Sequence, residues 1–534
     1  MSLRRDEVES LILKGQHVVI YHDNVLRIPT AWLDAHPGGA LSILHFVGRD
    51  ATDEIDALHP TGTLDLIAKY SIGKHHEKYW VPFLPPVAAG WVRENGQWRR
   101  EAAYISGDQP LLVEEQLSSS GLGPTAATIT PAPTDLDLDV QARQSAAYKA
   151  LHRRIIDAGL YKCPILTGYG PEFVRYTLFG VISAYAYYHS WLITSAFFLG
   201  LMWHQLMFFA HDLGHMGLTG DWTFDRLVST FIADWIGGLS IGWWVDNHNI
   251  HHSEFYFHSV LPHLYCHAVV TNHVNHDPDI QHLPFFAISP AFFNNLYSTY
   301  YKRTMPLDAP AKIFLTLQHK LFYIVMMFAR LNLYRLSYAH LYFRAFDTRR
   351  ARGHGWAWGL EVAGIVFFWT WFGSLLVGCG TWRKALLYVL VSHATTSPLH
   401  VQIVLSHFSM STADLGPTES FPHRQLRTTS DVICDESIEF IHGGLHLQVT
   451  HHLFPRLPRH NLRKASEMVK KFAQEQGLTY AEFGFVSGNK EVVGLLKHVG
   501  GLVNQVKIVA EVADAEAKEA VDKKIKGQEE KKVG

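Results

Sequence analysis

Residues 176–210 read YTLFGVISAYAYYHSWLITSAFFLGLMWHQLMFFA, a run of 35 residues without Asp, Glu, Lys or Arg. A helix needs about 20 mostly apolar residues to cross the hydrocarbon core of a bilayer, with a lower limit of about 17. The run is therefore long enough for two short spans, and we expect a helical hairpin that turns near His189. This stretch predicts an α-helical membrane protein.

A second pair of apolar segments, at residues 356–379 and 382–406, is separated by the turn sequence GCGT. With the first hairpin, this pair predicts about four transmembrane helices. Residues 227–245 and 313–329 are apolar but short or interrupted, so we expect interfacial or re-entrant helices there. Two hairpins would leave both termini on one side, and the Arg-rich residues 329–352 identify that side as cytosolic.

The composition supports a membrane protein and excludes some other classes. Of 534 residues, 48% are hydrophobic and only 18% are charged, against about 25% in typical soluble domains. Because the formal net charge is −2, nucleic acid is not an expected partner. The four cysteines form no CxxC pair, and the start of the chain has no signal-peptide pattern, which favours a reducing, cytosol-facing environment. The 34 histidines suggest metal binding, since histidine is the commonest metal ligand.

An N-terminal stretch, DAHPGGALSILHFVGRDATDEIDALHP at residues 34–60, places His36 in an HPGG turn and His59 23 residues later. We expect a strand at residues 17–21 and helices at 40–48 and 64–70. The stretch resembles the cytochrome b5 family over about residues 5–80. The resemblance implies a small α+β domain that binds haem b through His36 and His59, while the glycines of the HPGG turn let the backbone approach the ring. Two ordinary surface histidines are the alternative interpretation.

Three further histidine clusters are HDLGH at residues 211–215, HNIHH at 248–252 and QVTHH at 448–452. On a helix, positions i, i+3 and i+4 share one face, so each cluster directs its side chains toward one point. Together the clusters can supply several ligands to each of two iron ions and leave positions open for oxygen; structural histidines are the alternative. The candidate side chains are His211, His215, His248, His251, His252, Gln448, His451 and His452.

The motifs FFAHDLGHMG, WWVDNHNIHH and LQVTHHLFPRLPRHNL resemble the membrane-bound fatty-acyl desaturase superfamily over about residues 165–480. Gln448, in place of the first histidine of the third cluster, is typical of its front-end branch with fused cytochrome b5. The resemblance implies membrane helices under a cytosolic di-iron cap, with the eight side chains above as iron ligands and O2 as co-substrate.

Other polar residues near the clusters are weaker candidates. His407 is a candidate further ligand, followed by His400 and His204, whereas a structural role is expected for His442 and His446. Two aspartates, Asp212 and Asp246, either orient histidine rings through the second ring N–H or face solvent.

The expected activity is a lipid desaturation in which electrons pass from the fused haem to the two non-haem irons. No GxGxxG fingerprint is present, so the electron donor would be a separate NADH-dependent cytochrome b5 reductase. The motifs HDLGHMG, DNHNIHH and SPLHVQIVLSHF resemble most the fungal sphingolipid C8 desaturases, which implies a ceramide or other sphingolipid as substrate and a C8 double bond in its long-chain base. A front-end acyl desaturase, a lipid hydroxylase and a non-catalytic haem electron carrier are the alternatives.

We expect a ceramide to require a polar rim, from residues 243–258 and 292–303, above an apolar tunnel.

These observations predict four regions: a haem domain at residues 1–85, a flexible linker at 86–147, a membrane desaturase domain at 148–490 and a charged tail at 491–534. The Ser-, Thr- and Pro-rich composition of the second region cannot bury enough apolar surface to fold. A flexible tether would keep the haem domain at high effective concentration. The expected location is the endoplasmic reticulum membrane, among its lipids, with the haem domain, the histidine clusters and both termini facing the cytosol.

Overall fold

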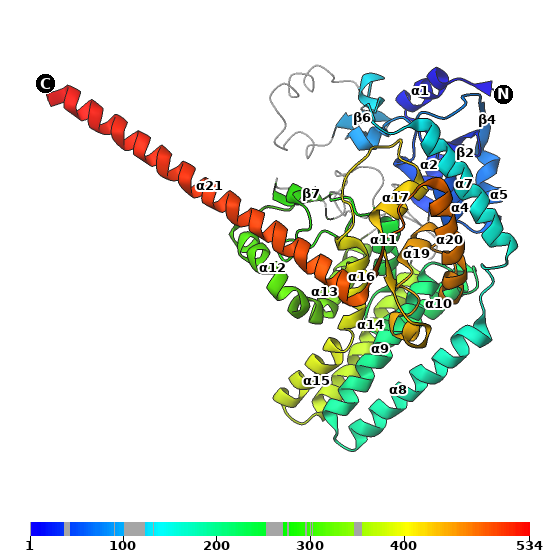
Figure 1. The fold of residues 1–534 in the computed structure, drawn as a ribbon. Coiled ribbons are helices and arrows are strands. Elements are labelled where there is room, and N and C mark those ends of the chain that lie inside the picture. The colour runs from blue at the N-terminus through cyan, green and yellow to red at the C-terminus, as the bar shows by residue number, and fades with distance from the viewer. Residues whose placement is uncertain are drawn as a thin grey trace.

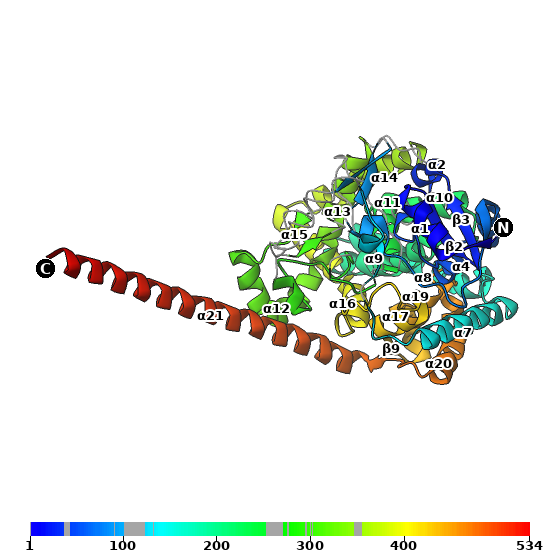
Figure 2. The same ribbon diagram turned by 90° about the horizontal axis from the view of Figure 1, so that it is seen from above.

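A computed structural model of the chain describes residues 2–36, 43–89, 91–94, 96–100, 123–131, 133–252, 271–274, 277–293, 296–298, 301, 303–346 and 355–533. The protein is mostly helical, with a small N-terminal α/β domain above a helical body (Figure 1). A long C-terminal helix projects from one side of that body (Figures 1 and 2).

The N-terminal domain is built on a four-stranded sheet in the order β1 (Ser2–Leu3), β4 (Ser71–His75), β3 (Asn24–Ile28) and β2 (His17–Tyr21). Successive residues of β2 face opposite sides, so Val18 and Ile20 pack in one apolar cluster and Val19 and Tyr21 in another. The helices are α1 (Arg5–Leu13), α2 (Thr30–Ala35), α4 (Thr52–Leu58) and α5 (Thr61–Ile67), the last followed by a 3-10 turn at Ala68–Tyr70.

The predicted elements of this domain agree with the structure where it describes them. The strand expected at residues 17–21 is β2, and the helix expected at 64–70 matches α5 and its 3-10 turn. The helix expected at 40–48 is the exception: residues 43–44 are helical but 45–48 form a turn, and 40–42 lie outside the described residues together with Gly38 and Gly39 of the HPGG turn.

The expected linker at residues 86–147 contains ordered elements. The hairpin β5 (Trp91–Glu94) and β6 (Gln97–Arg100) contacts the N-terminal domain, where Trp98 Nε1 donates to the carbonyl of Leu13 at 3.0 Å. Ile129 is fully buried in the core of that domain, and α7 (Leu138–Asp157) begins where the side chain of Asp137 caps its first turn. Composition did not predict these contacts, because each depends on only one or two aromatic or apolar residues. Residues 101–122 lie outside the described part of the chain.

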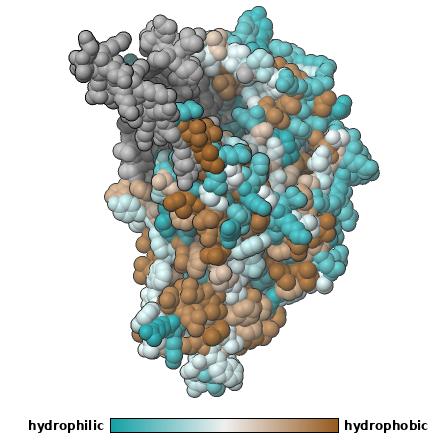
Figure 3. All heavy atoms as spheres, turned by 60° about the vertical axis from the view of Figure 1, so that its left-hand side comes forward, coloured by the Kyte–Doolittle hydropathy of each residue, from teal (hydrophilic) through white to brown (hydrophobic). Residues whose placement is uncertain are grey.

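The predicted hairpin at residues 176–210 is present as α8 (Gly170–Tyr188) and α9 (Leu192–Gly214), which turn at residues 189–191. Apolar side chains such as Val174, Leu178 and Val181 are exposed along α8. Figure 3 shows apolar side chains gathered over the lower part of the body, as expected of a surface in contact with lipid.

Within the described ranges, two helices are long and apolar enough to cross a membrane, namely α9 and α14 (Trp356–Gly378). A third span is counted if α12 (Ala309–Met327) and α13 (Ala329–Arg344), which bend by 69° at their junction, form one broken or re-entrant span. The expected four spans are therefore not confirmed. The apolar segment at 382–406 is divided into α15 (Trp382–Ala394) and α16 (Ser397–Phe408), because Pro398 lies in the first turn of a new helix.

The segment expected to be interfacial at residues 227–245 begins in α10 (Trp222–Thr230), passes through a π-helical turn at Phe231–Ile236 and enters α11 (Ile241–His252). The buried carboxylate of Glu361 on α14 fixes this region. It accepts hydrogen bonds from the Ser240 hydroxyl at 2.5 Å and the backbone N–H of Gly242 at 3.1 Å, and pairs with Arg226. These contacts hold the first turn of α11 against the membrane helices.

The remaining chain caps the body. Its elements are α17 (Phe421–Thr428), β9 (Asp431–Ile433) parallel to β10 (Glu482–Gly484), α18 (Glu439–His442), α19 (Gln448–Leu453) and α20 (Leu462–Gln476). Helix α21 (Phe485–Val533) runs unbroken through the expected boundary at 490/491 and packs against α12 through buried residues such as Leu496 and Val499. Short elements elsewhere are β7 (Tyr297–Ser298), β8 (Arg303–Thr304), a π turn at Ile165–Tyr169, and 3-10 turns at Pro86–Ala89, Ala127–Ile129, Pro290–Phe293, Glu436–Ile438 and Arg459–Asn461.

Candidate metal centres

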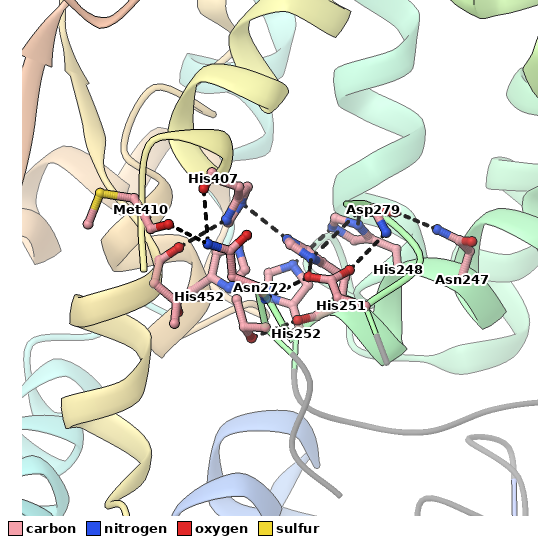
Figure 4. A network of polar contacts seen from close by, with 12 residues as sticks. Asn247, His248, His251, His252, Asn272, Asp279, His407, Met410 and His452 are labelled. Atoms are coloured by element: carbon pink, nitrogen blue, oxygen red, sulfur yellow. Dashed lines mark hydrogen bonds and ion pairs between the residues drawn. The ribbon is translucent and has the colours of Figure 1, made fainter. Parts of the chain in front are cut away.

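The three histidine clusters meet in the interior of the body, at the ends of α9, α11 and α19. One candidate metal group has five buried histidines whose ligand atoms lie within 4.8 Å of one another, and a second has three. The first group consists of His211, His215, His248, His252 and His451; the second of His251, His407 and His452. Figure 4 shows residues of both groups converging from α11, α16 and α19.

Close packing of α9 against α11 brings the first two clusters together. A Cβ atom at Gly214, inside the HDLGH cluster, would lie 2.2 Å from the Trp244 ring on α11. Glycine is therefore required for this contact, which puts the rings of His211 and His248 at a centroid distance of 5.1 Å.

The donor atoms of these groups fit a metal site. Within the two groups, five buried ring nitrogens have no hydrogen-bond partner among the described residues: Nε2 of His211, His215, His451 and His452, and Nδ1 of His252. In addition, Nε2 of His251 lies 3.1 Å from Nε2 of His407, and Nε2 of His252 lies 2.9 Å from Nε2 of His248. Burying so many unpaired nitrogens is unfavourable unless a cation binds them. Nitrogen-rich groups of this kind suit iron among other transition metals.

Two carboxylates that sequence reasoning missed support the His251 and His248 rings. Nδ1 of His251 donates to Asp277 at 2.8 Å, and Asp279 lies 3.7 Å from Nδ1 of His248. Burial disfavours the imidazolium form of His251, but Asp277 and Asp279 outweigh that effect and raise its pKa to about 9. These two aspartates with His251 also form a third group of possible ligands. Their sequence context, HDPD, is typical of a loop and gave no signal of this role.

The two aspartates proposed from sequence behave differently. Asp212 lies 3.4 Å from Nδ1 of His211 and also accepts a hydrogen bond from Tyr169. Asp246 instead lies 3.8 Å from His340 and 3.9 Å from Arg344, on α13. Asp212 is thus the one of the two placed to orient a ring of the first group.

The other candidate histidines differ in whether they belong to one of the candidate metal groups. His407 belongs to the second group, whereas His400 and His204 belong to none of the groups found among the described residues. His442 hydrogen-bonds to Gln402 at 2.5 Å, and His446 lies 3.1 Å from Glu439, as expected of structural residues.

A cavity of about 780 Å³ extends from the histidine groups into the body, within the usual range for ligand pockets. It is lined by Gln448 together with His211, His248 and His407, and by apolar residues such as Trp203 and Met326. Polar side chains also line it: Tyr301, Arg303, Asn332 and Arg335. Of the expected polar rim, Asn247, Tyr301 and Arg303 line this cavity, while residues 253–270 lie outside the description.

The N-terminal domain holds a separate candidate site. The rings of His36 and His59 face each other with centroids 5.9 Å apart. Because a ring nitrogen lies about 2 Å from a bound transition metal, this spacing suits one ion between the two rings. Nδ1 of His59 lies 3.0 Å from the carbonyl of Ile55, which leaves Nε2 for a metal, and burial lowers the pKa of His59. The surrounding apolar cluster, which includes Leu26 and Phe46, fits a haem.

The fold and these sites define a membrane protein with two candidate metal sites. One is lined by histidines at the ends of α9, α11 and α19. The other lies between His36 and His59 in the N-terminal domain. The chain belongs to the fatty acid desaturase family, whose model matches residues 188–484, and a cytochrome b5-like heme/steroid binding domain matches residues 4–76. These matches confirm the resemblances inferred from the sequence motifs.

Named relatives match along nearly the whole chain. It is 41% identical to the Delta 8-(E)-sphingolipid desaturase of Emericella nidulans, over 97% of each chain. It is 37% identical to the protein of the same name from Candida albicans, over 93% of this chain and 95% of that one. The Delta(8)-fatty-acid desaturase 2 of Arabidopsis thaliana is 30% identical over 88% of this chain and 86% of its own.

Proposed function

We propose that this chain is an O2-dependent sphingolipid 8-desaturase that introduces a double bond at C8 of the long-chain base of a ceramide or related sphingolipid. The observation that carries the proposal is the cavity, which is lined by histidines of both buried groups, by apolar residues and by polar side chains. The full-length similarity to several Delta 8-(E)-sphingolipid desaturases supports the position of the double bond.

In this proposal His211, His215, His248, His252 and His451 hold one iron, and His251, His407 and His452 hold the other. Gln448, which lines the same cavity as His211, His248 and His407, is a candidate additional ligand. When bound, the irons supply the oxygen activation that removal of hydrogen from an unactivated C–H bond requires. The net reaction removes two hydrogens from adjacent carbons and, with two electrons and two protons, reduces O2 to two waters.

The chain's own residues bind and orient the substrate. The apolar residues of the wall, such as Trp203 and Met326, hold the hydrocarbon chain and exclude water, and one segment of it lies beside the histidine groups. The side chains of Tyr301, Arg303 and Arg335, which also line the cavity, offer donors to the amide and hydroxyl groups of a ceramide. A head group held there fixes which carbon reaches the metal centre.

The head-group assignment predicts a binding defect in Arg335→Leu. One hydrogen bond contributes about 1 kcal/mol net, so we expect KM for ceramide to rise about fivefold while kcat changes little. Lys312→Leu, an exposed change on α12 outside the cavity, is the control. Steady-state kinetics with ceramide in nanodiscs checks this, and an unchanged KM removes Arg335 from the head-group site.

The supporting carboxylates predict a metal defect in Asp277→Asn. Loss of a carboxylate behind a ligating histidine costs about 10- to 100-fold in metal affinity or activity. We expect the variant to lose non-haem iron on dialysis against a chelator that leaves the wild-type chain loaded. Asp225→Asn is a matched control, since Asp225 is fully buried but hydrogen-bonds to residues 219–220 instead. Equal iron retention in all three proteins would contradict the role of Asp277.

Electrons in this proposal reach the metal centre from haem b held by His36 and His59, which is reduced by a separate NADH-dependent cytochrome b5 reductase. The location proposed is the endoplasmic reticulum membrane, with the haem domain and histidine groups on its cytosolic side. The family membership and the apolar surface of the lower helices support a membrane location.

The haem assignment predicts that His59→Ala loses haem during purification, and with it the Soret absorbance of the full chain, because one remaining imidazole no longer holds the iron from both faces. His36→Ala should do the same. Non-haem iron content should stay at the wild-type value, since the two sites share no ligand. A normal Soret band in both variants would contradict the assignment.

Purified full-length chain in nanodiscs with ceramide, NADH, reductase and O2 tests the proposed reaction. We expect an 8-unsaturated long-chain base in proportion to the NADH consumed. A product hydroxylated at the same carbon would instead indicate a hydroxylase, and haem reduction without any lipid product would indicate an electron carrier.

A further inference from the structure

The haem domain shares a chain with the desaturase domain, and its helix α4 also packs against α7. Figure 2 shows α7 between α4 and α20, and α7 contacts both helices. Ala57 of α4 is fully buried and belongs to an apolar cluster that is otherwise built from the desaturase domain and α7, including Tyr148, Leu151 and Val469. Apolar burial of this kind stabilises one relative position of the two domains.

Polar contacts on the same helix are specific. The Ser145 hydroxyl of α7 donates to Asp53 at 2.5 Å, and Lys149 Nζ lies 3.7 Å from the other oxygen of Asp53. Asp53 is 6% exposed and Glu54 4% exposed, and Arg424 of α17 is the strongest electrostatic partner of Glu54. Burying two carboxylates is costly unless basic groups and donors compensate. Asp53 of α4 therefore has both a hydrogen-bond donor and a basic partner on α7, and Arg424 of α17 is the strongest basic influence on Glu54.

Tyr148 of α7 also contacts the residues that follow the third histidine cluster. The Tyr148 hydroxyl donates to the carbonyl of Leu453 at 2.7 Å, and its ring stacks on Phe454 with centroids 5.3 Å apart. Leu453 directly follows His452, and on the haem side Ala57 precedes His59 by two residues. Tyr148 thus lies between the residues next to both candidate metal sites.

We propose that α4 is the docking surface through which the haem domain delivers electrons to its own desaturase domain, across Tyr148 and the α19 end. This inference rests on the proposed function. Each transfer of one electron oxidises the haem from the ferrous to the ferric form and reduces the non-haem centre by one electron. Two transfers are therefore needed for each double bond. Because electron tunnelling weakens steeply with distance, the docked position is the productive one, and free movement on a tether is not required.

A disulfide across the contact tests whether the docked position is productive. The double variant Asp53→Cys, Ser145→Cys is made in a full chain whose four native cysteines are replaced by alanine. We expect a crosslink to form on mild oxidation, visible after denaturation as a change in gel mobility that dithiothreitol reverses. Failure to form it would contradict docking at this surface, whatever the metal content.

The crosslinked chain is then reduced chemically, so that reductase access plays no part, and is mixed with O2 and ceramide. We expect haem reoxidation within about twofold of the uncrosslinked chain, because the link holds the productive position. Reoxidation that stops on crosslinking and returns with dithiothreitol would overturn the proposal. A wild-type chain that makes no 8-unsaturated base would instead contradict the proposed function.

Charge reversal provides an independent check. Lys149→Glu places a third carboxylate beside Asp53 and Glu54, and we expect haem reoxidation to slow about tenfold, which corresponds to about 1.4 kcal/mol. The Soret spectrum should not change. Arg154→Glu, the same change on an exposed side of α7, is the control, and Asp53→Lys in the Lys149→Glu chain should restore part of the rate. Equal slowing in the control and the test variant would contradict a specific surface.

Discussion

Alanine at His211 is expected to lower product formation by more than about 100-fold, because losing a ligand should exceed the 10- to 100-fold cost of losing a supporting residue. His211 contributes to the five-histidine group, and its Nε2 has no partner among the described residues. Non-haem iron should fall while the Soret spectrum stays unchanged. Metal analysis and absorbance spectra of the same sample measure both.

The control for this variant is His204→Ala. His204 lies on the same helix seven residues earlier, which is about two turns, and it is 4% exposed against 7% for His211. Since it belongs to neither histidine group, its loss should leave the iron content at the wild-type value. Equal iron loss in the two variants would mean that α9 is simply destabilised, and the assignment of His211 would fail.

The second large effect is expected from His407→Ala, which alters a histidine outside the three sequence clusters. His407 lies with His251 and His452 in the smaller group, so its loss should reduce the non-haem iron from two per chain to about one. We expect product formation to fall by more than about 100-fold, as for a ligand of the first group. Quantitative iron analysis per haem gives the ratio directly.

His400→Ala is the matched control, because His400 lies on α16 seven residues before His407 and lines the same cavity without joining a group. It should retain two non-haem irons. If His400→Ala loses iron and His407→Ala does not, the ligand set of the second group is wrong.

Sequence reasoning predicted the parts of the site that depend on local spacing. The uncharged run at 176–210 determines a hairpin by length alone. The same holds for His36 and His59, whose separation in sequence matches a domain small enough to bring them face to face. The spacing of HNIHH brings its rings to the centre, but the expectation that each cluster points to one site is wrong, because His248 and His252 join the first group and His251 the second.

The parts that sequence missed depend on contacts between distant segments. Asp277 supports His251 only because a loop 26 residues later returns to α11, and periodicity carries no information about such a return. The break between α15 and α16 was missed because hydrophobicity continues through it, although Pro398 marks a new helix start. The ordered hairpin within the expected linker depends on Trp98 reaching Leu13, a contact that composition does not reveal.

The central claim is the identity of the substrate and of the bond that is changed, and lipid analysis of a host that lacks 8-unsaturated sphingolipids tests it most directly. The full chain is expressed there beside the His211→Ala variant, and long-chain bases and acyl chains are analysed separately by mass spectrometry that locates double bonds. The account predicts 8-unsaturated long-chain bases in the wild-type strain alone. New double bonds confined to acyl chains, with long-chain bases unchanged, would contradict it and would identify an acyl desaturase.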